Sequence, residues 1–349
     1  MKLYSKLEGL ELRIESFETE TREKKVSENF TRKTTVVKFS GNRKTGKGED
    51  VIYEPEKHFY PGLELEGTYT FHEFSQKLEE EKLFPEDVEY DKTDENYRRW
   101  AIESAALDLA LKQNNQTLAE ALGESYRPLR FVVSLSMDTP SIEKLQDLIE
   151  LNSSIEFKLD ASEAWDETFV EKLVEMDRVK VVDLKGHYKK ENVGMNPDPE
   201  IYRLIAEKMD ALIEDPKLTD ETEKVLENFK ERITWDYPIT GLKSVKKLPF
   251  RPDYLNIKPS RFGTVKSLLD TIEYCQENNI QMYGGGQFEL DIGRQHIHAV
   301  ASIFYPKGPN DVAPRTYNQE KIPENPPKSP LRPEKDLEGL EWRYRDNSF

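Results

Sequence analysis

The feature that most constrains the fold is a regular alternation of short apolar runs and amphipathic segments, which begins after Arg127 and Pro128. Apolar runs of strand length recur at residues 129–136, 154–160, 179–186, 210–215, 232–238, 253–259 and 280–286. Between them, apolar residues repeat at helical spacing in residues 141–151, 166–176, 198–209, 220–231, 242–248, 264–278 and 292–304. Repeated units of this kind predict parallel strands joined by helical crossovers, and a closed barrel accommodates them most economically.

The residues before this alternation show a different hydrophobic periodicity. Residues 10–53 alternate in strand fashion, which predicts an antiparallel meander with a polar hairpin at GNRKTGKGED. That hairpin lacks the order of a phosphate-binding loop. Helical patterns follow at residues 69–83 and 96–113, so we expect an α+β domain over residues 1–126. The barrel would then occupy residues 127–309, and the Pro-rich residues 310–349 would form an extended tail over the cap or barrel surface.

Composition limits the classes of partner. The chain of 349 residues is long enough for a barrel with an accessory domain. Its 51 Lys and Arg against 67 Asp and Glu give a formal charge of -16, which disfavours nucleic acids and anionic membranes as partners. No apolar run is long enough to span a bilayer and no secretion signal is evident, so a cytoplasmic location is expected. The single Cys275 excludes disulfides and cysteine-cluster metal sites.

Five successive strand patterns end in a charged residue, although charged side chains are almost never fully buried unless they are paired. These residues are Lys158, Asp183, Glu214, Asp236 and Lys258. In a barrel of parallel strands the carboxyl ends meet at the face where active sites are built. We therefore expect the five side chains to lie close together at this end of the barrel.

Their chemistry is that of a metal site with a base. Three carboxylates side by side stay ionised only with a cation, and oxygen donors without Cys or clustered His indicate Mg²⁺. Lys158 and Lys258 would flank this ion, and a lysine next to a metal charge can act as a base near neutral pH. An isolated acid at a strand end is usually a helix N-cap or a solvated loop residue. Only the ordered series on consecutive strands favours the site.

At this point the sequence resembles the enolase superfamily, in its muconate-lactonizing-enzyme-like branch. The resemblance covers most of the chain and rests on VVDLKG, LIEDP, TWDYP and LNIKPSRFG in that order, with AIESAALDLALKQ before them and GGGQFELDIGRQ after them. It implies a modified (β/α)7β barrel of the TIM type, with an N-terminal α+β capping domain over its mouth. It also implies removal of a proton alpha to a carboxylate, with Mg²⁺ holding the enediolate.

The resemblance assigns roles by position. Asp183, Glu214 and Asp236 match the metal ligands, and Lys258 matches the lysine of the sixth strand. Lys158 falls where the family's second strand carries a lysine-x-lysine motif.

Two further residues can each be interpreted in two ways. Glu289 matches the family's strand-seven glutamate and would face the substrate, although a carboxylate that complements a helix start is equally expected. Lys185 follows Asp183 where many members carry Ala-Asn, and it either adds a third cation near the metal or points away.

The second strand departs from the family pattern. Side chains alternate along a strand, so Glu156, Lys158 and Asp160 are predicted to share a face. A carboxylate there would raise the pKa of Lys158, which is the wrong direction for a base. No histidine stands on the seventh strand, which argues against a mandelate-racemase type of His base. His296 and His298 are interpreted as structural.

The reaction class is predicted more sharply than the substrate. Two opposed lysines favour epimerisation, cycloisomerisation or elimination of a small carboxylic acid. Specificity is expected from cap loops near residues 27–35 and 44–49 and from the strand-end residues Ser134 and Ser136. A homo-oligomer is possible on the family pattern. Two alternatives stay open: an inactive member that binds an acid metabolite, and a metal-dependent aldolase or hydrolase on an ordinary barrel.

Overall fold

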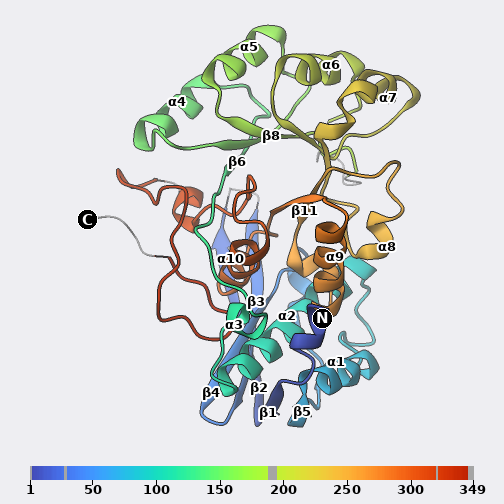
Figure 1. The fold of residues 1–349 in the computed structure, drawn as a ribbon, viewed down its shortest axis with the longest axis vertical. Helices are drawn as coiled ribbons and strands as arrows, with labels where there is room; N and C mark the ends of the chain where they lie inside the picture. Colours follow the sequence, from blue (N-terminus) through green and yellow to red (C-terminus); the bar gives the residue numbers. More distant parts are fainter. Residues whose placement is uncertain (1, 27–29, 188–194, 320, 345–349) are drawn as a thin grey trace.

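A computed structural model describes residues 2–26, 30–187, 195–319 and 321–344. In the N-terminal region, called the cap below, the strands are Glu11–Ile14 (β1), Ser16–Lys25 (β2), Thr31–Gly41 (β3), Lys44–Asp50 (β4) and Gly67–Thr70 (β5). Its helices are Phe71–Glu80 (α1), Lys92–Gln113 (α2) and Leu118–Ala121 (α3), with 3-10 turns at Tyr4–Lys6 (η1) and Pro55–His58 (η2). The cap lies at the opposite end of the molecule from α4 to α7 of the barrel, whose bounds are given below (Figure 1).

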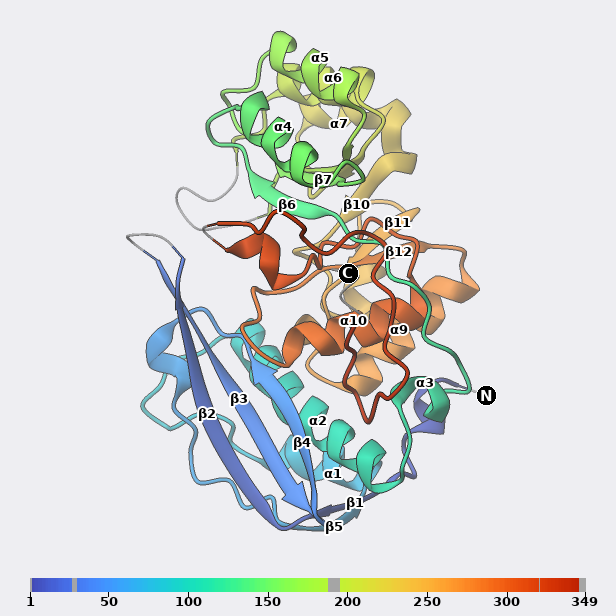
Figure 2. The ribbon, with the colours of Figure 1, turned by 90° about the vertical axis from the view of Figure 1, so that its left-hand side faces the viewer.

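The long cap sheet has the antiparallel order β2-β3-β4, and its predicted hairpin is present, with Gly41 opposite Lys44. β1 does not continue this meander as predicted; it pairs with β5 instead. Residues 44–49, predicted as a loop, lie in β4 on α2 (Figure 2). The cause is close packing, because a Cβ on Gly48 would lie 1.9 Å from the carbonyl oxygen of Ala101.

Side-chain caps fix where the cap helices begin. The Thr70 hydroxyl accepts the Glu73 N–H at 3.3 Å, and the Glu73 carboxylate accepts the Thr70 N–H at 2.7 Å, which is a capping box. Asp91 and Asp94 make the equivalent exchange at the start of α2. The helix α2 is buried along most of its 22 residues, since it lies between the cap sheet and the barrel.

The remaining strands form one parallel sheet in chain order. They are Val133–Ser136 (β6), Phe157–Asp160 (β7), Val179–Asp183 (β8), Leu212–Glu214 (β9), Ile233–Trp235 (β10), Tyr254–Ile257 (β11) and Gln281–Gly284 (β12). The connecting helices are Ile142–Leu151 (α4), Glu167–Met176 (α5), Pro199–Lys208 (α6), Asp220–Leu226 (α7), Leu242–Val245 (α8), Val265–Glu277 (α9) and Gly293–Phe304 (α10). Shorter 3-10 turns lie at Glu227–Arg232 (η3), Pro259–Phe262 (η4) and Arg315–Asn318 (η5). The predicted α/β architecture with a separate N-terminal α+β domain is confirmed.

Asn310 and Asp311 bring the two edges of this curled sheet together. Asn310 forms a parallel bridge with Phe131, just before β6, and Asp311 forms one with Gly285, just after β12. The Val132 N–H donates to the Asn310 carbonyl at 2.8 Å, and the Asp311 N–H donates to the Gly284 carbonyl at 2.7 Å. The first residues of the predicted tail therefore lie in the ring of strands.

The rest of the tail contacts both regions (Figure 2). Leu331 bridges Leu129 at the start of the barrel. The Gly339 carbonyl accepts the Leu118 N–H at 2.9 Å, and Glu341 pairs with Lys112 of α2 at 2.6 Å. The division of the chain at residues 126 and 309 stays a prediction. Among the helices in the described part of the chain, none is long and apolar enough to cross a membrane.

Candidate active site at the carboxyl ends of the strands

The five charged residues predicted from strand ends lie at one end of adjacent strands. Lys158 is in β7, Asp183 ends β8, Glu214 ends β9, and Asp236 and Lys258 directly follow β10 and β11. Asp183 and Glu214 are register partners. All five are buried, with relative exposures between 0% and 7%. A barrel end that buries so much charge requires close pairing of acids and bases.

Lys158 lies among three acids. Its Nζ is in contact with Glu214, 3.2 Å from Asp183 Oδ2 and 3.5 Å from Asp311 Oδ2. Burial alone would lower the pKa of Lys158, but Glu214 and Asp183 outweigh it and hold the pKa well above its usual value. Lys158 is therefore a firmly protonated ammonium in this arrangement.

The carboxylate of Glu214 also has neutral partners. The Tyr283 hydroxyl donates to Oε2, and the Asn256 amide donates to the same oxygen at 3.3 Å. Burial raises the pKa of Glu214 to about 8, although Lys158 acts in the opposite direction. Negative charge at this end of the barrel is thus only partly compensated.

Asp236 belongs to a second group of contacts. Its Oδ2 is 2.8 Å from Lys258 Nζ and its Oδ1 is 3.1 Å from Arg261 Nη1. Asp215 accepts the backbone N–H of Asp236 at 2.9 Å and that of Tyr237 at 2.8 Å, which fixes the end of β10. Burial raises the pKa of Asp215 to about 7, and the charge of Asp236 adds to the effect.

The run of glycines after Tyr283 makes room for this group. A Cβ on Gly285 would lie 2.7 Å from Lys258 Cε and 2.7 Å from Asn256 Oδ1. A Cβ on Gly286 would lie 2.4 Å from Glu289 Oε2. The backbone of the β12 end is therefore the wall against which the Lys258 stem lies.

Lys185 lies beside the acids rather than pointing away. Its Nζ is 2.9 Å from Asp183 Oδ2 and 3.1 Å from Asp160 Oδ1. Together with Lys158 it outweighs the effect of burial and holds the pKa of Asp183 below its usual range. The expected third cation is present next to the predicted metal ligand.

The two acids predicted beside Lys158 on its own strand have other ion-pair partners. Glu156 pairs with Arg130 at 2.6 Å, and Asp160 pairs with Lys185. The register of β7 against β8 shifts between Phe157 and Lys158 because β8 contributes the extra residue Lys180, so the alternation within β7 itself is not interrupted. The expected rise in the pKa of Lys158 is found, but acids of β8 and β9 cause it.

The two serines of β6 stand next to this group. Ser134 is the register partner of Lys158, and Ser136 is the partner of Asp160; both are exposed.

Glu289 lies in the loop between β12 and α10. It is 3% exposed, its Oε1 accepts the Gln287 N–H at 2.6 Å, and its Oε2 is 3.8 Å from Arg294 Nε. Its carboxylate therefore accepts an amide of its own loop, and both alternatives for Glu289 stay predictions.

His296 and His298 are buried in α10, as their interpretation as structural residues predicted.

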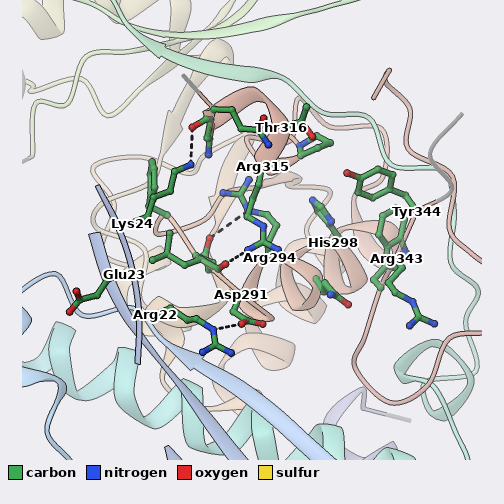
Figure 3. A pocket seen from close by; sticks show the side chains of 18 of the residues that line it. Arg22, Glu23, Lys24, Asp291, Arg294, His298, Arg315, Thr316, Arg343 and Tyr344 are labelled. Carbon is green, nitrogen blue, oxygen red and sulfur yellow. Dashed lines mark hydrogen bonds and ion pairs between the residues drawn. The ribbon is translucent and has the colours of Figure 1, made fainter. Parts of the chain in front are cut away.

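A separate side pocket of about 750 Å³ lies between β2, the start of α10 and the tail (Figure 3). Arg22 pairs with Asp291 at 2.7 Å across it, and Lys24 donates to the Asn318 carbonyl at 2.9 Å. The Arg294 guanidinium donates to the Ala313 carbonyl at 2.6 Å. These cations hold the cap, α10 and tail together, so the pocket is mainly a junction.

The residue types at the barrel end fit a magnesium ion. Asp183 and Glu214 end consecutive strands, Asp236 directly follows the next one, and their carboxylates are hard oxygen donors of the kind that magnesium prefers. In the conformation described, Lys158 contacts two of these three acids. Over the described residues, no group of three or more Asp, Glu, His or Cys is gathered closely enough to hold a metal. The donor chemistry fits, and a bound ion would have to replace the Lys158 ammonium.

Several residues of this site were missed from the sequence. Asp311 follows Gly308 and Pro309 without any strand-length apolar run, so periodicity gave no signal for it. Asp215 stands beside Glu214, and its adjacency to a predicted ligand could have indicated a supporting role. Arg261 lies in the turn after Lys258 in KPSRFG, three residues beyond the lysine.

Comparisons with known proteins were made with the sequence and with the fold. The models described as the N-terminal and C-terminal domains of a domain of unknown function (DUF8230) match residues 5–121 and 125–319. An o-succinylbenzoate synthase from Listeria innocua is 26% identical over 212 residues, which cover 58% of this chain and 55% of that protein. The chain thus spans about half the length of the curated relatives it matches.

Solved structures of similar fold match most of the length of the chain. A dipeptide epimerase from Methylococcus capsulatus, complexed with Mg ion, matches with a TM-score of 0.66 and 17% identity, covering 96% of this chain and 100% of that one. An enolase superfamily member from Enterococcus faecalis matches with a TM-score of 0.63 and 20% identity over 86% of each chain. Muconate lactonizing enzyme from Pseudomonas putida matches with a TM-score of 0.64 and 16% identity, covering 95% of this chain and 97% of that one.

Proposed function

The chain belongs to the DUF8230 family and has the two-domain fold of the enolase superfamily, and on that premise we propose that it is a magnesium-dependent enzyme. The proposed reaction is abstraction of a proton alpha to the carboxylate of a small organic acid. Epimerisation, cycloisomerisation or β-elimination would follow from the enediolate.

One observation carries this proposal. Three buried acids and two buried lysines stand at the same end of five consecutive parallel strands, β7 to β11, or directly after them. Charged groups are expensive to bury without a task, and the carboxyl ends of barrel strands are where catalytic residues gather. The likeness in fold to a Mg-bound dipeptide epimerase supports the same assignment.

In the proposed site, Asp183, Glu214 and Asp236 would hold the metal. Bound there, Mg²⁺ supplies Lewis-acid stabilisation of a substrate carboxylate as it gains negative charge. Lys158 would give up its contacts with Asp183 and Glu214 and become available to the substrate.

Lys258 is the proposed base, because it directly follows β11, its ammonium lies 2.8 Å from Asp236 Oδ2, and its stem lies against the backbone of Gly285. Asp236 and Arg261 orient it by sharing one ion-pair network. Lys158, on β7, would protonate or deprotonate the opposite face of the substrate carbon.

Three residues are proposed to contact the substrate. Ser134 is exposed next to Lys158 on the neighbouring strand, and Lys185 lies beside Asp183. Glu289 is proposed as a more remote contact, since it lies in the loop that follows β12.

The deciding experiment is proton exchange. The protein is incubated in D₂O with Mg²⁺ and a panel of acids that includes o-succinylbenzoate, muconate and dipeptides, after the names of its relatives. Deuterium at the α-carbon, observed by NMR and lost in Lys258→Met, is the expected result. A wild-type protein that binds Mg²⁺ but exchanges no proton in any of these acids would contradict the proposal.

A second candidate, a non-catalytic binder of an acid metabolite, has its own supporting observation. Lys158 is held protonated among acids, which is unfavourable for a base. Calorimetric binding of a panel acid without any exchange would favour this reading.

A further inference from the structure

Glu49 of β4 lies across the boundary between cap and barrel. Its Oε1 accepts the N–H of Leu290 at 2.6 Å, and its Oε2 accepts the N–H of Gly293 at 2.8 Å. The Asp291 N–H lies 3.0 Å from both oxygens. Glu49 is 1% exposed, so a buried carboxylate of the cap satisfies the free amides at the start of α10.

Arg32 of β3 binds the same loop from its carbonyl side. Its guanidinium donates to the carbonyls of Gln287 at 2.9 Å and Phe288 at 3.2 Å. It also donates to Val51 and Ile52, which continue the chain after β4. Arg32 is completely buried. Two cap residues of opposite charge therefore hold residues 287–293 by both their amides and their carbonyls.

The loop that they hold is strained. Phe288 has a φ of +57°, a conformation that is unfavourable for a bulky residue. Such strain persists only where surrounding contacts over-determine it, and it gathers at functional sites. The loop also tolerates no side chain at Gly293, where a Cβ would lie 2.7 Å from Glu289 Cγ and 3.0 Å from Glu49 Oε2.

The held loop reaches the candidate active site through Gln287. With the Gln287 amide turned so that its oxygen faces Arg261, that oxygen accepts from Nε at 2.9 Å and Nη2 at 3.2 Å. Arg261 in turn lies 3.1 Å from Asp236, which pairs with Lys258. A continuous set of contacts thus runs from the cap to the proposed base.

We propose that Glu49 and Arg32 are positioning residues: by fixing residues 287–293 they set Gln287 against Arg261, and through it the placement of Asp236 and Lys258. Docking of the cap and formation of the site are then one event. The catalytic meaning of this placement rests on the proposed function, whereas the placement itself does not.

The test measures the accessibility of Lys258 without metal or substrate. A short pulse of acetic anhydride labels lysines, and mass spectrometry compares Lys258 with Lys112, whose side chains are 8% and 7% exposed. Lys112 belongs to α2 and pairs with Glu341 of the tail, so its labelling reports general loosening of the fold. The variants are Glu49→Gln and Arg32→Lys, and the control is Glu18→Gln, an exposed acid on the same cap sheet.

We expect labelling of Lys258 to rise about tenfold relative to Lys112 in Glu49→Gln, because the amide group turns an N–H donor toward backbone N–H groups. Hydrogen exchange at Leu290, Asp291 and Gly293 should accelerate in the same variant. Glu18→Gln should change neither readout. Arg32→Lys, which keeps the charge but loses the fork of donors, should show the same direction with a smaller rise.

If labelling of Lys258 and Lys112 rises by the same factor in Glu49→Gln, the proposal is overturned, because an equal rise indicates general destabilisation of the fold. Unchanged labelling of both lysines, with faster exchange in residues 290–293, would also overturn it, because the loop would then have opened without affecting the site. If the wild-type protein binds no Mg²⁺, the proposed function fails while this comparison of two lysines still stands.

Discussion

The two sides of the candidate site bury the same kinds of charge in different ways. On the side of β7 to β9, called the acid-rich side, one ammonium, Lys158, contacts three acids. On the side of β10 to β12, called the base-rich side, one acid, Asp236, lies between Lys258 and Arg261. Removal of Lys158 would leave Glu214 without an ammonium, whereas removal of Lys258 would leave Asp236 with Arg261. The base-rich side is therefore better suited to supply a base.

The largest effect is expected from Lys158→Met. It leaves Glu214 buried without its ammonium and Asp183 with Lys185 alone, and loss of one partner from a buried ion pair costs about 3–5 kcal/mol. Urea unfolding should report this loss. If the acids can hold Mg²⁺, millimolar Mg²⁺ should restore part of the stability of this variant and much less in wild type. If Lys158→Met is as stable to urea as the wild-type protein, the description of the acid-rich side is refuted.

Lys258→Met should have a smaller effect, about 1–2 kcal/mol, because Arg261 still compensates Asp236. The same urea titration measures it. Lys258→Arg serves as a control that keeps the charge. A loss equal to that of Lys158→Met would mean that the two sides do not differ.

The response to acid sharpens the comparison, because α10 follows β12 on the base-rich side and carries His296. Burial lowers the pKa of His296 to about 3, and neither ring nitrogen has a hydrogen-bond partner among the described residues. Below its unfolded value of 6.5 the unfolded chain binds a proton that the folded chain does not, so stability should fall between pH 6.5 and about 3.

His296→Leu should flatten this pH dependence and raise stability near pH 5 by about 1 kcal/mol, since two unpaired buried nitrogens disappear. Thermal unfolding at pH 5 and pH 8 measures the difference. An identical slope in wild type and variant would show that another group causes the acid response.

The smallest effect is expected from Glu156→Gln. Glu156 pairs with the partly exposed Arg130, so its loss should cost less than about 1 kcal/mol. Magnesium affinity, measured by calorimetry, should be unchanged, because Glu156 is not one of the acids around Lys158. A large change in magnesium affinity would mean that Glu156 does belong to the acids of the acid-rich side.

The sequence by itself determined the architecture and the principal charged residues. The helix and strand periods predicted the alternating units, and the charge at five strand ends identified Lys158, Asp183, Glu214, Asp236 and Lys258. Such patterns are local, and the carboxyl ends of parallel strands meet in any barrel. For the same reason Glu49, a residue of a predicted loop, gave no local signal of its contact with α10, more than 240 residues away.

Tertiary structure alone decided which charges meet. Glu156 pairs with Arg130 rather than with Lys158, and the bridges at Asn310 and Asp311 brought the Asp311 carboxylate to Lys158. Ion pairs between strands depend on register and on closure of the sheet, and neither is encoded in the period of one segment. The pairing that separates the acid-rich side from the base-rich side is therefore a property of the folded barrel.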